Sequence, residues 1–270
     1  MPLSEGAFES TVPAALFSLR GRRALITGAG QGIGLMLARG LGLAGAEVVL
    51  NDKEPARLGA AVAMLRREGL AVEGCIFDVT DEKAIATGVA SLARGEFEVG
   101  GGIDILINNA GIHQRAPLEL MSTVAWQAVL DVNLTSAFLV TRGVVAGMLQ
   151  RGSGKIINIC SLNSEISRPT IANYAAAKGG LKMLTRAMAV EWGGRNVQTN
   201  GIAPGYLRTE MTDVLTVDPV WERLICARTP AGRWGEPREL IGAAVFLASR
   251  GADFVNGQII TVDGGLLAAL

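Results

Sequence analysis

The sequence has few of the side chains that bind metals or form disulfides, and it carries no net charge. Its 270 residues include one histidine and three cysteines, and 25 basic residues balance 25 acidic ones. A single imidazole excludes most metal centres, so we expect no metal. Three scattered cysteines provide no disulfide framework and favour a reducing cytoplasm. A net charge of zero argues against nucleic-acid binding by phosphate neutralisation.

Long apolar runs are also missing. No uninterrupted apolar stretch reaches the roughly 18 residues that a membrane-spanning helix needs. The N-terminal stretch contains Glu5 and Glu9 and no basic start, which does not fit a secretory signal. With 49% hydrophobic and 19% charged residues, disorder is excluded. We predict a loose N-terminal arm over residues 1–18 and one domain over residues 19–270.

A glycine-rich turn is the most informative feature that is present. Residues 27–34 read Thr-Gly-Ala-Gly-Gln-Gly-Ile-Gly, between an apolar run at 24–26 and a helix-like segment at 35–38. Glycine allows a tight turn and lets the backbone approach an anion closely. A helix that begins there adds unpaired N–H groups and a partial positive charge. The turn therefore predicts a site for the pyrophosphate of a dinucleotide.

Strand-like and helix-like segments alternate along the chain, which predicts an α/β fold: a single-domain, doubly wound parallel sheet of about seven strands with helices on both faces. Strands are expected at 23–27, 47–51, 72–77, 103–107, 155–160, 197–202 and 258–262. Helices are expected at 33–44, 54–68, 81–97, 122–151, 173–193 and 237–249. Residues 205–233 interrupt this alternation and are interpreted as a substrate lid, or alternatively as a packing insertion.

A second group of residues supplies chemistry. Lys178 follows Tyr174 by four residues, so the ammonium and the phenol can share one helix face. Ser161 directly follows an expected strand, at the end where open α/β sheets bind ligands. A positive charge about 4 Å from the phenol contributes about 4 kcal/mol at an effective dielectric of 20, or roughly 3 pKa units, and burial offsets part of this. We therefore predict that Lys178 lowers the pKa of Tyr174 enough for general acid/base work.

With these motifs, the chain from about Leu19 to its end resembles the short-chain dehydrogenase/reductase family. The resemblance implies a nicotinamide cofactor, Tyr174 as the acid/base, and Ser161 as the donor to the substrate oxygen. The oxidised form of that cofactor would add a second positive charge near the phenol, beside that of Lys178. The resemblance also implies that Asn133 completes a proton relay through water and Lys178. The cofactor residues implied by the turn and by resemblance are Gly28, Gln31, Gly32, Ile33, Gly34, Asp52, Asp78, Val79, Asn109, Ala110, Gly111, Tyr174, Lys178, Pro204, Gly205 and Thr209.

Asp52 bears on the choice of cofactor. It ends the second expected strand, about twenty residues after the glycines, where a carboxylate can accept hydrogen bonds from the adenosine ribose. The carboxylate would repel a 2′-phosphate, so we expect a preference for NAD. NADP stays possible, because Lys53 stands where family members that use NADP often carry a basic residue. The alternative role for Asp52 is an N-cap of the following helix.

Further segments resemble the gluconate 5-dehydrogenase branch of the family, which interconverts gluconate and 5-ketogluconate. Among these segments are 202–206, 209–212 and 253–257. A sugar acid needs a cation for its carboxylate and polar groups for its hydroxyls. The candidate substrate residues are Ser161, Tyr174, Arg115, Asn163, Glu165 and Arg168, although each charged one could instead be a solvated loop residue or a subunit contact. The sequence His113-Gln114-Arg115 departs from the usual Gln-Arg-Arg of that branch, which leaves a different substrate open.

Other readings stay open as well. The chain could reduce another class of ketone, such as a keto-acyl or steroid substrate, or could bind nucleotides without catalysis. A serine hydrolase is disfavoured, because no Gly-x-Ser-x-Gly motif surrounds Ser161 and His113 is not obviously placed as its base. By resemblance we expect a homotetramer, with helices 122–151 and 173–193 at one interface and the apolar tail 264–270 at another.

Overall fold

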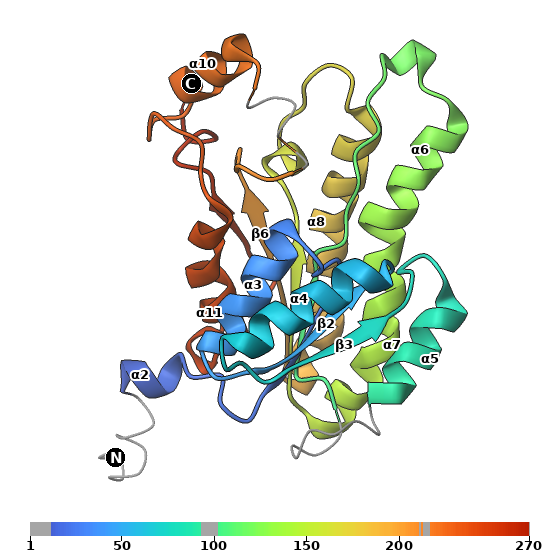
Figure 1. Cartoon of the computed structure of the whole chain (residues 1–270), viewed down its shortest axis with the longest axis vertical. Coiled ribbons are helices and arrows are strands. Elements are labelled where there is room, and N and C mark those ends of the chain that lie inside the picture. Colours follow the sequence, from blue (N-terminus) through green and yellow to red (C-terminus); the bar gives the residue numbers. More distant parts are fainter. Residues whose placement is uncertain (1–11, 93–101, 211, 213–216, 270) are drawn as a thin grey trace.

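The computed structural model describes residues 12–92, 102–210, 212 and 217–269, and these form one parallel sheet of seven strands (Figure 1). The strand order is β3-β2-β1-β4-β5-β6-β7. The strands are β1 (Arg23–Ile26), β2 (Glu47–Asp52), β3 (Val72–Ile76), β4 (Ile105–Asn108), β5 (Gly154–Ile159), β6 (Val197–Pro204) and β7 (Ile259–Val262). The predicted doubly wound α/β fold is confirmed, and every predicted strand is present.

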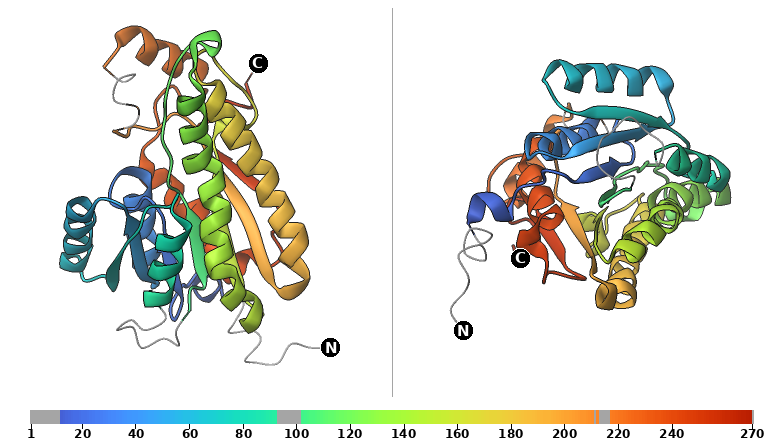
Figure 2. Two further views of the ribbon diagram at one scale, coloured as in Figure 1. Left: turned by 90° about the vertical axis from the view of Figure 1, so that its right-hand side faces the viewer. Right: turned by 90° about the horizontal axis from the view of Figure 1, so that it is seen from below.

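Helices cover both faces of the sheet, as the two views of Figure 2 show. One face carries α3 (Gly32–Leu43), α4 (Pro55–Arg67) and α11 (Ile241–Ala248), and the other carries α5 (Glu82–Leu92), α7 (Ser136–Arg151) and α8 (Ala172–Trp192). Ile26 of β1 belongs to the first core and its neighbour Leu25 to the second. Both are fully buried, because successive strand side chains point to opposite, covered faces. This explains why the strands read as continuous apolar runs.

The predicted helix over 122–151 is present but is not uniform. It consists of α6 (Thr123–Leu130), one wide π-helical turn, η2 (Asp131–Thr135), and α7. Its 29 residues are long and apolar enough to cross a membrane by length and composition alone. In the fold, α7 packs against β4 and β5. The helix is therefore part of the core, and core helices can be as long and as apolar as membrane-spanning ones.

The segment over 205–233 contains a helix that was not predicted from the sequence. α10 (Pro219–Arg228) begins with proline at its first position, and the Asp218 carboxylate accepts a hydrogen bond from the Val220 N–H at 2.9 Å. Proline at the first position and an aspartate N-cap are ordinary start signals for a helix. Residues 211 and 213–216 of the proposed lid lie outside the described part of the chain.

The N-terminal arm is described from residue 12 onward. It contains the short helix α2 (Pro13–Leu16), and the ring of Phe17 lies 6.2 Å from that of Phe246 in α11. The expected end of the helix over 81–97 lies partly outside the described residues, because the structure describes α5 only to Leu92.

The order of the strands creates a crevice. From β1 the chain moves outward through β2 and β3, then returns to place β4 on the opposite side of β1. At such a switch point, the loops that follow the two central strands diverge and leave a ligand site at their carboxyl ends. The predicted site residues lie at this edge of the sheet.

Candidate active site

The glycine turn joins β1 to α3 and leaves no room for side chains at two of its glycines. Gly28 has a φ of +61°, and a Cβ placed on it would lie 2.9 Å from the Cα of Ala110. A Cβ on Gly34 would lie 2.4 Å from the Gly28 carbonyl oxygen. Gln31, at the N-cap of α3, gives the helix no side-chain hydrogen bond. The turn therefore offers a bare helix N-terminus, which suits an anionic ligand.

Asn109 holds this turn in place from the end of β4. Its Nδ2 donates to the carbonyl oxygens of Thr27 and Gly28 at 2.9 and 3.1 Å. The backbone N–H groups of Asn109 and Ala110 donate to Thr27 Oγ1 at 3.0 and 3.1 Å. The segment Asn108-Asn109-Ala110-Gly111 is thus joined directly to the glycine turn, although it lies about eighty residues further along the chain.

Asp52 is the last residue of β2, and its carboxylate is bound by Arg57, which was not predicted from the sequence as part of the site. Arg57, in the first turn of α4, donates from Nε to Asp52 Oδ2 at 3.0 Å and from Nη2 to Oδ1 at 2.7 Å. The Glu54 N–H also donates to Oδ1, at 3.0 Å. Burial disfavours the charged carboxyl, but the hydrogen bonds from Arg57 and Glu54 outweigh it and lower the pKa of Asp52. The negative charge of Asp52 is therefore paired within the protein.

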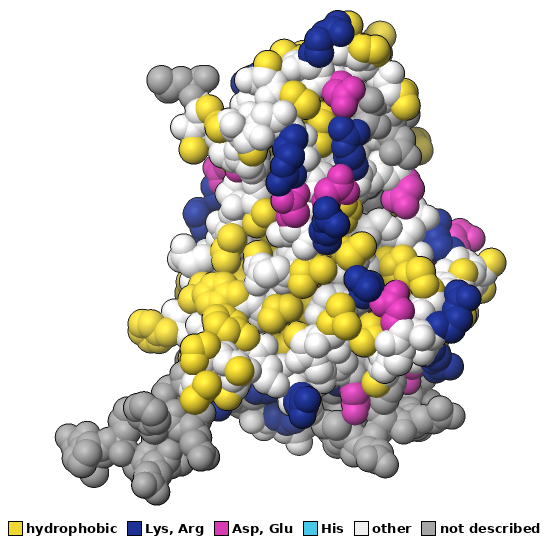
Figure 3. Space-filling view, turned by 60° about the vertical axis from the view of Figure 1, so that its left-hand side comes forward, with side chains coloured by type: hydrophobic (Ala, Val, Ile, Leu, Met, Phe, Trp, Pro, Cys, Tyr) yellow, Lys and Arg dark blue, Asp and Glu magenta, His cyan; other side chains and the backbone are white. Residues whose placement is uncertain are grey.

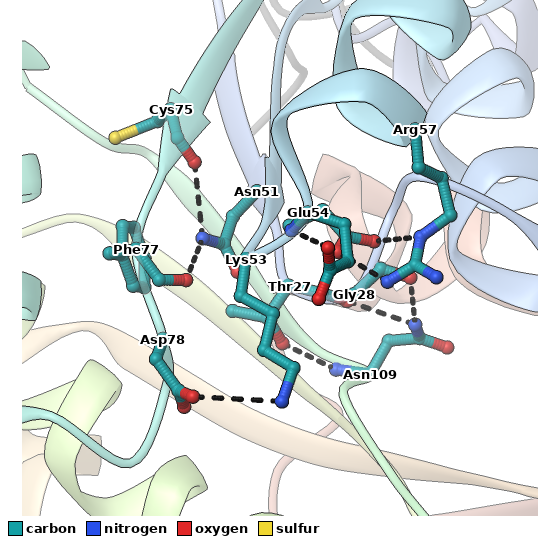
Figure 4. A network of polar contacts seen from close by, with 11 residues as sticks. Thr27, Gly28, Asn51, Lys53, Glu54, Arg57, Cys75, Phe77, Asp78 and Asn109 are labelled. Atoms are coloured by element: carbon teal, nitrogen blue, oxygen red, sulfur yellow. Dashed lines mark hydrogen bonds and ion pairs between the residues drawn. The ribbon is translucent and has the colours of Figure 1, made fainter.

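The alternative role of Asp52 as an N-cap is wrong, because Glu54 holds that position in α4. Lys53, the residue after Asp52, has its Nζ 3.8 Å from Asp78 Oδ2 (Figure 4). Lys53, Arg57 and Asp78 all line the cavity described below. Two cations and two carboxylates therefore surround the end of the cavity where β2 and β3 terminate.

The residues predicted to be catalytic meet at the end of β5. Ser161 follows this strand directly and is 7% exposed, and its Oγ accepts a hydrogen bond from the Asn163 N–H at 3.1 Å. Lys178, one turn after Tyr174 in α8, donates from Nζ to the carbonyl of Ile159 at 2.6 Å. The Lys178 Nζ lies 5.7 Å from the centre of the Tyr174 ring. The predicted grouping of these side chains is present.

The prediction that the phenol is acidified is wrong for the protein without cofactor. Burial raises the pKa of Tyr174 to about 12, and a hydrogen bond with Ser161 opposes this only in part. Burial also lowers the pKa of Lys178 to about 8. The prediction assumed that the Lys178 ammonium acts on the phenol directly. In the structure this ammonium donates a hydrogen bond to the Ile159 carbonyl, and the effect of burial on the pKa of Tyr174 is larger than that of the lysine charge.

Asn133 lies in the π-helical turn η2 and is 2% exposed. Its Nδ2 donates to the carbonyls of Ile112 and Val129 at 2.9 and 3.0 Å, and its Oδ1 accepts from the Ile112 N–H at 3.0 Å. The amide thus pairs in both directions with the loop after β4. Single π turns occur often at functional sites. Its part in a proton relay stays a prediction.

The loops after β4 and β5 bring two arginines together at the other end of the cavity. The Ala116 N–H donates to the Thr170 carbonyl at 3.1 Å, which joins the loops that carry Arg115 and Arg168. Burial and the nearby charge of Arg168 lower the pKa of Arg115. Within the described residues, neither guanidinium forms an ion pair with a carboxylate; that of Arg168 lies 5.3 Å from the ring centre of Trp221 in α10.

Glu165 has a different environment from the one expected. Its carboxylate pairs with Lys182 of α8, and it is not among the residues that line the cavity.

The chain between Arg168 and Tyr174 is constrained, because Thr170 has a φ of +72°. A β-branched residue rarely adopts this conformation, and such strain is often found in ligand-binding loops.

One continuous cavity contains nearly all of the predicted site residues. Gly34 and Glu165 are the exceptions. The predicted residues that line the cavity are Gly28, Gln31, Gly32, Ile33, Asp52, Asp78, Val79, Asn109, Ala110, Gly111, Arg115, Asn133, Ser161, Asn163, Arg168, Tyr174, Lys178, Pro204, Gly205 and Thr209. Among the residues that the structure describes, no group of three or more His, Cys, Asp or Glu side chains is arranged to hold a metal ion. The cavity thus joins the glycine turn to the residues that were predicted to be catalytic.

Comparison with known proteins agrees with this geometry. A family model described as enoyl-(acyl carrier protein) reductase matches residues 28–267. A gluconate 5-dehydrogenase from Gluconobacter oxydans is 52% identical over 255 residues, which cover 94% of this chain and 98% of that protein. The chain belongs to the short-chain dehydrogenase/reductase family. The predicted family resemblance is confirmed.

Two further relatives of this short-chain dehydrogenase/reductase are similar over nearly their whole length. A 5-keto-D-gluconate 5-reductase from Escherichia coli K12 is 49% identical over 255 residues, or 94% of this chain and 99% of that protein. The crystal structure of a gluconate 5-dehydrogenase from Burkholderia cenocepacia, in complex with NADP and tartrate, is 48% identical with a TM-score of 0.92; the match covers 96% of this chain and all of that one. The bare N-terminus of α3 and the cavity that runs from Gly28 to Lys178 fit a nicotinamide dinucleotide.

Proposed function

We propose that this enzyme is an NAD(P)-dependent oxidoreductase that interconverts gluconate and 5-ketogluconate. The observation that carries the proposal is a pair of arginines, Arg115 and Arg168, that have no carboxylate partner in the described part of the chain and line the same cavity as the predicted catalytic group. The catalytic group suits a secondary alcohol, and the guanidinium pair suits a carboxylate on the same molecule. The names of the relatives support the C5 hydroxyl of gluconate as the reacting group.

The residues have separate tasks in this reaction. When bound, the nicotinamide accepts or supplies the hydride. Tyr174 gives its phenolic proton to the ketone oxygen or takes the proton of the alcohol, and Ser161 donates a hydrogen bond to that same oxygen. A pKa near 8 keeps Lys178 mostly protonated at neutral pH, and the Ile159 carbonyl holds its ammonium at the catalytic end of the cavity. A pKa of about 12 keeps the phenol protonated, which is the form that reduction needs.

The arginines also weigh against the other substrate classes. An apolar acyl or steroid substrate would bury two guanidinium groups without a counter-charge, which costs free energy. A sugar acid supplies the missing anion. We therefore expect Arg115→Lys and Arg168→Lys, which lose the planar fork but keep the charge, to raise the KM for gluconate by about tenfold each.

The function is tested by measuring turnover with gluconate and 5-ketogluconate, using NAD(H) and NADP(H), beside a keto-acyl thioester and a steroid ketone. We expect kcat/KM to be highest for the sugar-acid pair. Faster turnover of the thioester or the steroid would overturn the proposed substrate. No turnover of any of the four, together with tight cofactor binding, would favour a non-catalytic nucleotide-binding protein instead.

The structure changes the expected choice of cofactor. Asp52 alone favours NAD, but Arg57 neutralises it, and Arg57 and Lys53 both line the cavity. We propose that the enzyme accepts both cofactors. Asp52 would accept hydrogen bonds from the ribose hydroxyls of NAD, and Arg57 and Lys53 would bind the 2′-phosphate of NADP. The NADP complex of the Burkholderia relative supports the second half of this proposal.

We also propose a homotetramer located in the cytoplasm. Large apolar side chains are exposed on the outer helices, such as Met183 and Val190 of α8, at 57% and 86%, and Phe254 is fully exposed. Figure 3 shows a further gathering of hydrophobic side chains across the middle of the face where α11 lies. Such patches favour subunit contacts. Light scattering that gives a monomer mass would refute the tetramer.

The proposed location in the cytoplasm is supported by the cysteines. All three are free thiols, which suits a reducing compartment.

A further inference from the structure

His113, the only histidine in the chain, lies face to face with the catalytic Tyr174. The two ring centres are 3.8 Å apart, and the ring planes differ by 23°. His113 belongs to the loop after β4 and Tyr174 to α8, so the contact joins two walls of the cavity. The reaction as described above assigns no task to this imidazole.

The two ring nitrogens have different surroundings. Nδ1 is buried and has no hydrogen-bond partner among the described residues. No hydrogen bond involves Nε2 either, and this atom is not buried. A neutral imidazole carries one N–H group and one bare nitrogen. A proton on Nδ1 would leave a buried donor unpaired, so the favoured tautomer carries its proton on Nε2 and offers a donor to the cavity.

Burial, with the help of nearby positive charges, keeps His113 neutral. Burial is the main cause that lowers its pKa to about 4, and the cations of Arg115, Arg168 and Lys178 lower it further. Tyr174, which stacks on the ring, is also titratable, and its raised pKa keeps it uncharged at neutral pH. His113 is therefore a hydrogen-bond donor of fixed protonation and not an acid or base in turnover.

We propose that His113 is a specificity-determining residue whose Nε2–H donates a hydrogen bond to the substrate hydroxyl adjacent to the carbon that reacts. This inference rests on the proposed function, because gluconate carries hydroxyls on both carbons that flank C5. Stacking on Tyr174 places the imidazole beside the phenol that handles the reacting hydroxyl. A substrate without the neighbouring hydroxyl would leave this donor unpaired, and a site built on such a donor rejects that substrate.

Two variants separate the hydrogen bond from the stacking contact. His113→Phe keeps an aromatic ring against Tyr174 but removes the N–H group. His113→Gln keeps an N–H donor but removes the ring. If His113 only supported the tyrosine, phenylalanine would be the better replacement; if it binds a hydroxyl, glutamine would be.

The experiment measures kcat/KM for the wild type and both variants with gluconate, 4-deoxygluconate and 6-deoxygluconate. With gluconate, we expect His113→Phe to lose about tenfold or more and His113→Gln to lose about threefold or less. With one of the two deoxy substrates, the wild type and His113→Phe should agree within about twofold. Dissociation constants for the cofactor, from fluorescence titration, should be the same for all three proteins.

An equal loss for His113→Phe on all three substrates overturns the inference, because a purely structural role would not depend on a substrate hydroxyl. A larger loss for His113→Gln than for His113→Phe also overturns it, since stacking would then be the main contribution. These outcomes leave the proposed function intact when the wild type oxidises gluconate. A wild type that does not turn over gluconate refutes the proposed function, and this inference with it.

Discussion

The Lys178 ammonium donates a 2.6 Å hydrogen bond to the carbonyl of Ile159, the last residue of β5. The contact fixes the first turns of α8 to the strand that precedes Ser161. Two turns further along α8, Thr185 Oγ1 accepts a hydrogen bond from Asn158 Nδ2 at 2.8 Å, from the neighbouring residue of the same strand. The register of one helix on one strand therefore sets where the catalytic phenol lies.

Replacing Tyr174 by phenylalanine removes the proton donor and keeps the ring. Because general acid/base groups contribute about 10² to 10⁴ in rate, we expect kcat to fall by that factor. Lys178 and the glycine turn are untouched, so the dissociation constant of NADH, measured by fluorescence titration, should change less than twofold. Turnover within tenfold of the wild type would contradict the assigned role.

The Asp52–Arg57 pair should control the choice of cofactor. Arg57→Ala frees the carboxylate to repel a 2′-phosphate, and we expect it to lower kcat/KM for NADP relative to NAD by about 10- to 100-fold. Asp52→Asn should shift the ratio the other way. Arg67→Ala is a matched control, because Arg67 lies on the same helix and, among the described residues, its side chain donates a hydrogen bond only to the Ala63 carbonyl. A shift in Arg67→Ala as large as that in Arg57→Ala would remove the special role of the pair.

Gly34 should tolerate no side chain. In Gly34→Ala the new methyl group would lie within 2.5 Å of both the Gly28 carbonyl oxygen and Asn109 Nδ2. We expect a loss of about 1–3 kcal/mol in the free energy of unfolding, measured with urea, and weaker cofactor binding. Gly59→Ala in α4 is the control, since nothing lies within 4 Å of its added Cβ. That change should stabilise the protein by about 0.5–1 kcal/mol. Equal effects in the two variants would be inconsistent with the tight turn.

Acid should destabilise the protein in part through His113. Its pKa is 6.5 when unfolded and about 4 when folded, so between these values the unfolded chain binds more protons. Stability is therefore unaffected by this group above pH 6.5 and falls as the pH is lowered toward 4, by up to about 3 kcal/mol. Urea unfolding of the wild type and His113→Gln at pH 7 and 4.5 measures the difference. A steeper loss in the variant would reverse the assigned sign.

Most of the fold could be predicted from local patterns. Leu25 and Ile26 read as part of a continuous apolar run, and this pattern indicates a parallel strand covered on both faces. The helix start at Pro219 carried an ordinary signal too, but the segment was interpreted as irregular because it breaks the strand–helix alternation. The π turn at Asn133 was not predicted from the sequence, and the hydrogen bonds of its side chain join it to the backbone of Ile112, twenty-one residues away.

The candidate site was predicted less completely than the fold. Ser161, Tyr174 and Lys178 were found because their spacing is local. Arg57 could have been found, since a basic residue in the first turn of a helix lies close to the end of the preceding strand. Glu165 was assigned to the substrate from its position after Ser161, but its pairing with Lys182 depends on how α8 packs against that loop.

The sequence by itself determined the order of strands and helices, the glycine turn and the spacing of the catalytic residues, because these depend on backbone conformation over a few neighbouring residues. Only the tertiary structure decided that His113 stacks on Tyr174, that the charge of Arg168 lies near Arg115, and that burial raises the pKa of the phenol despite the nearby lysine. These properties depend on distances between remote segments and on the exclusion of water, and both arise only when the whole sheet and its helices are assembled.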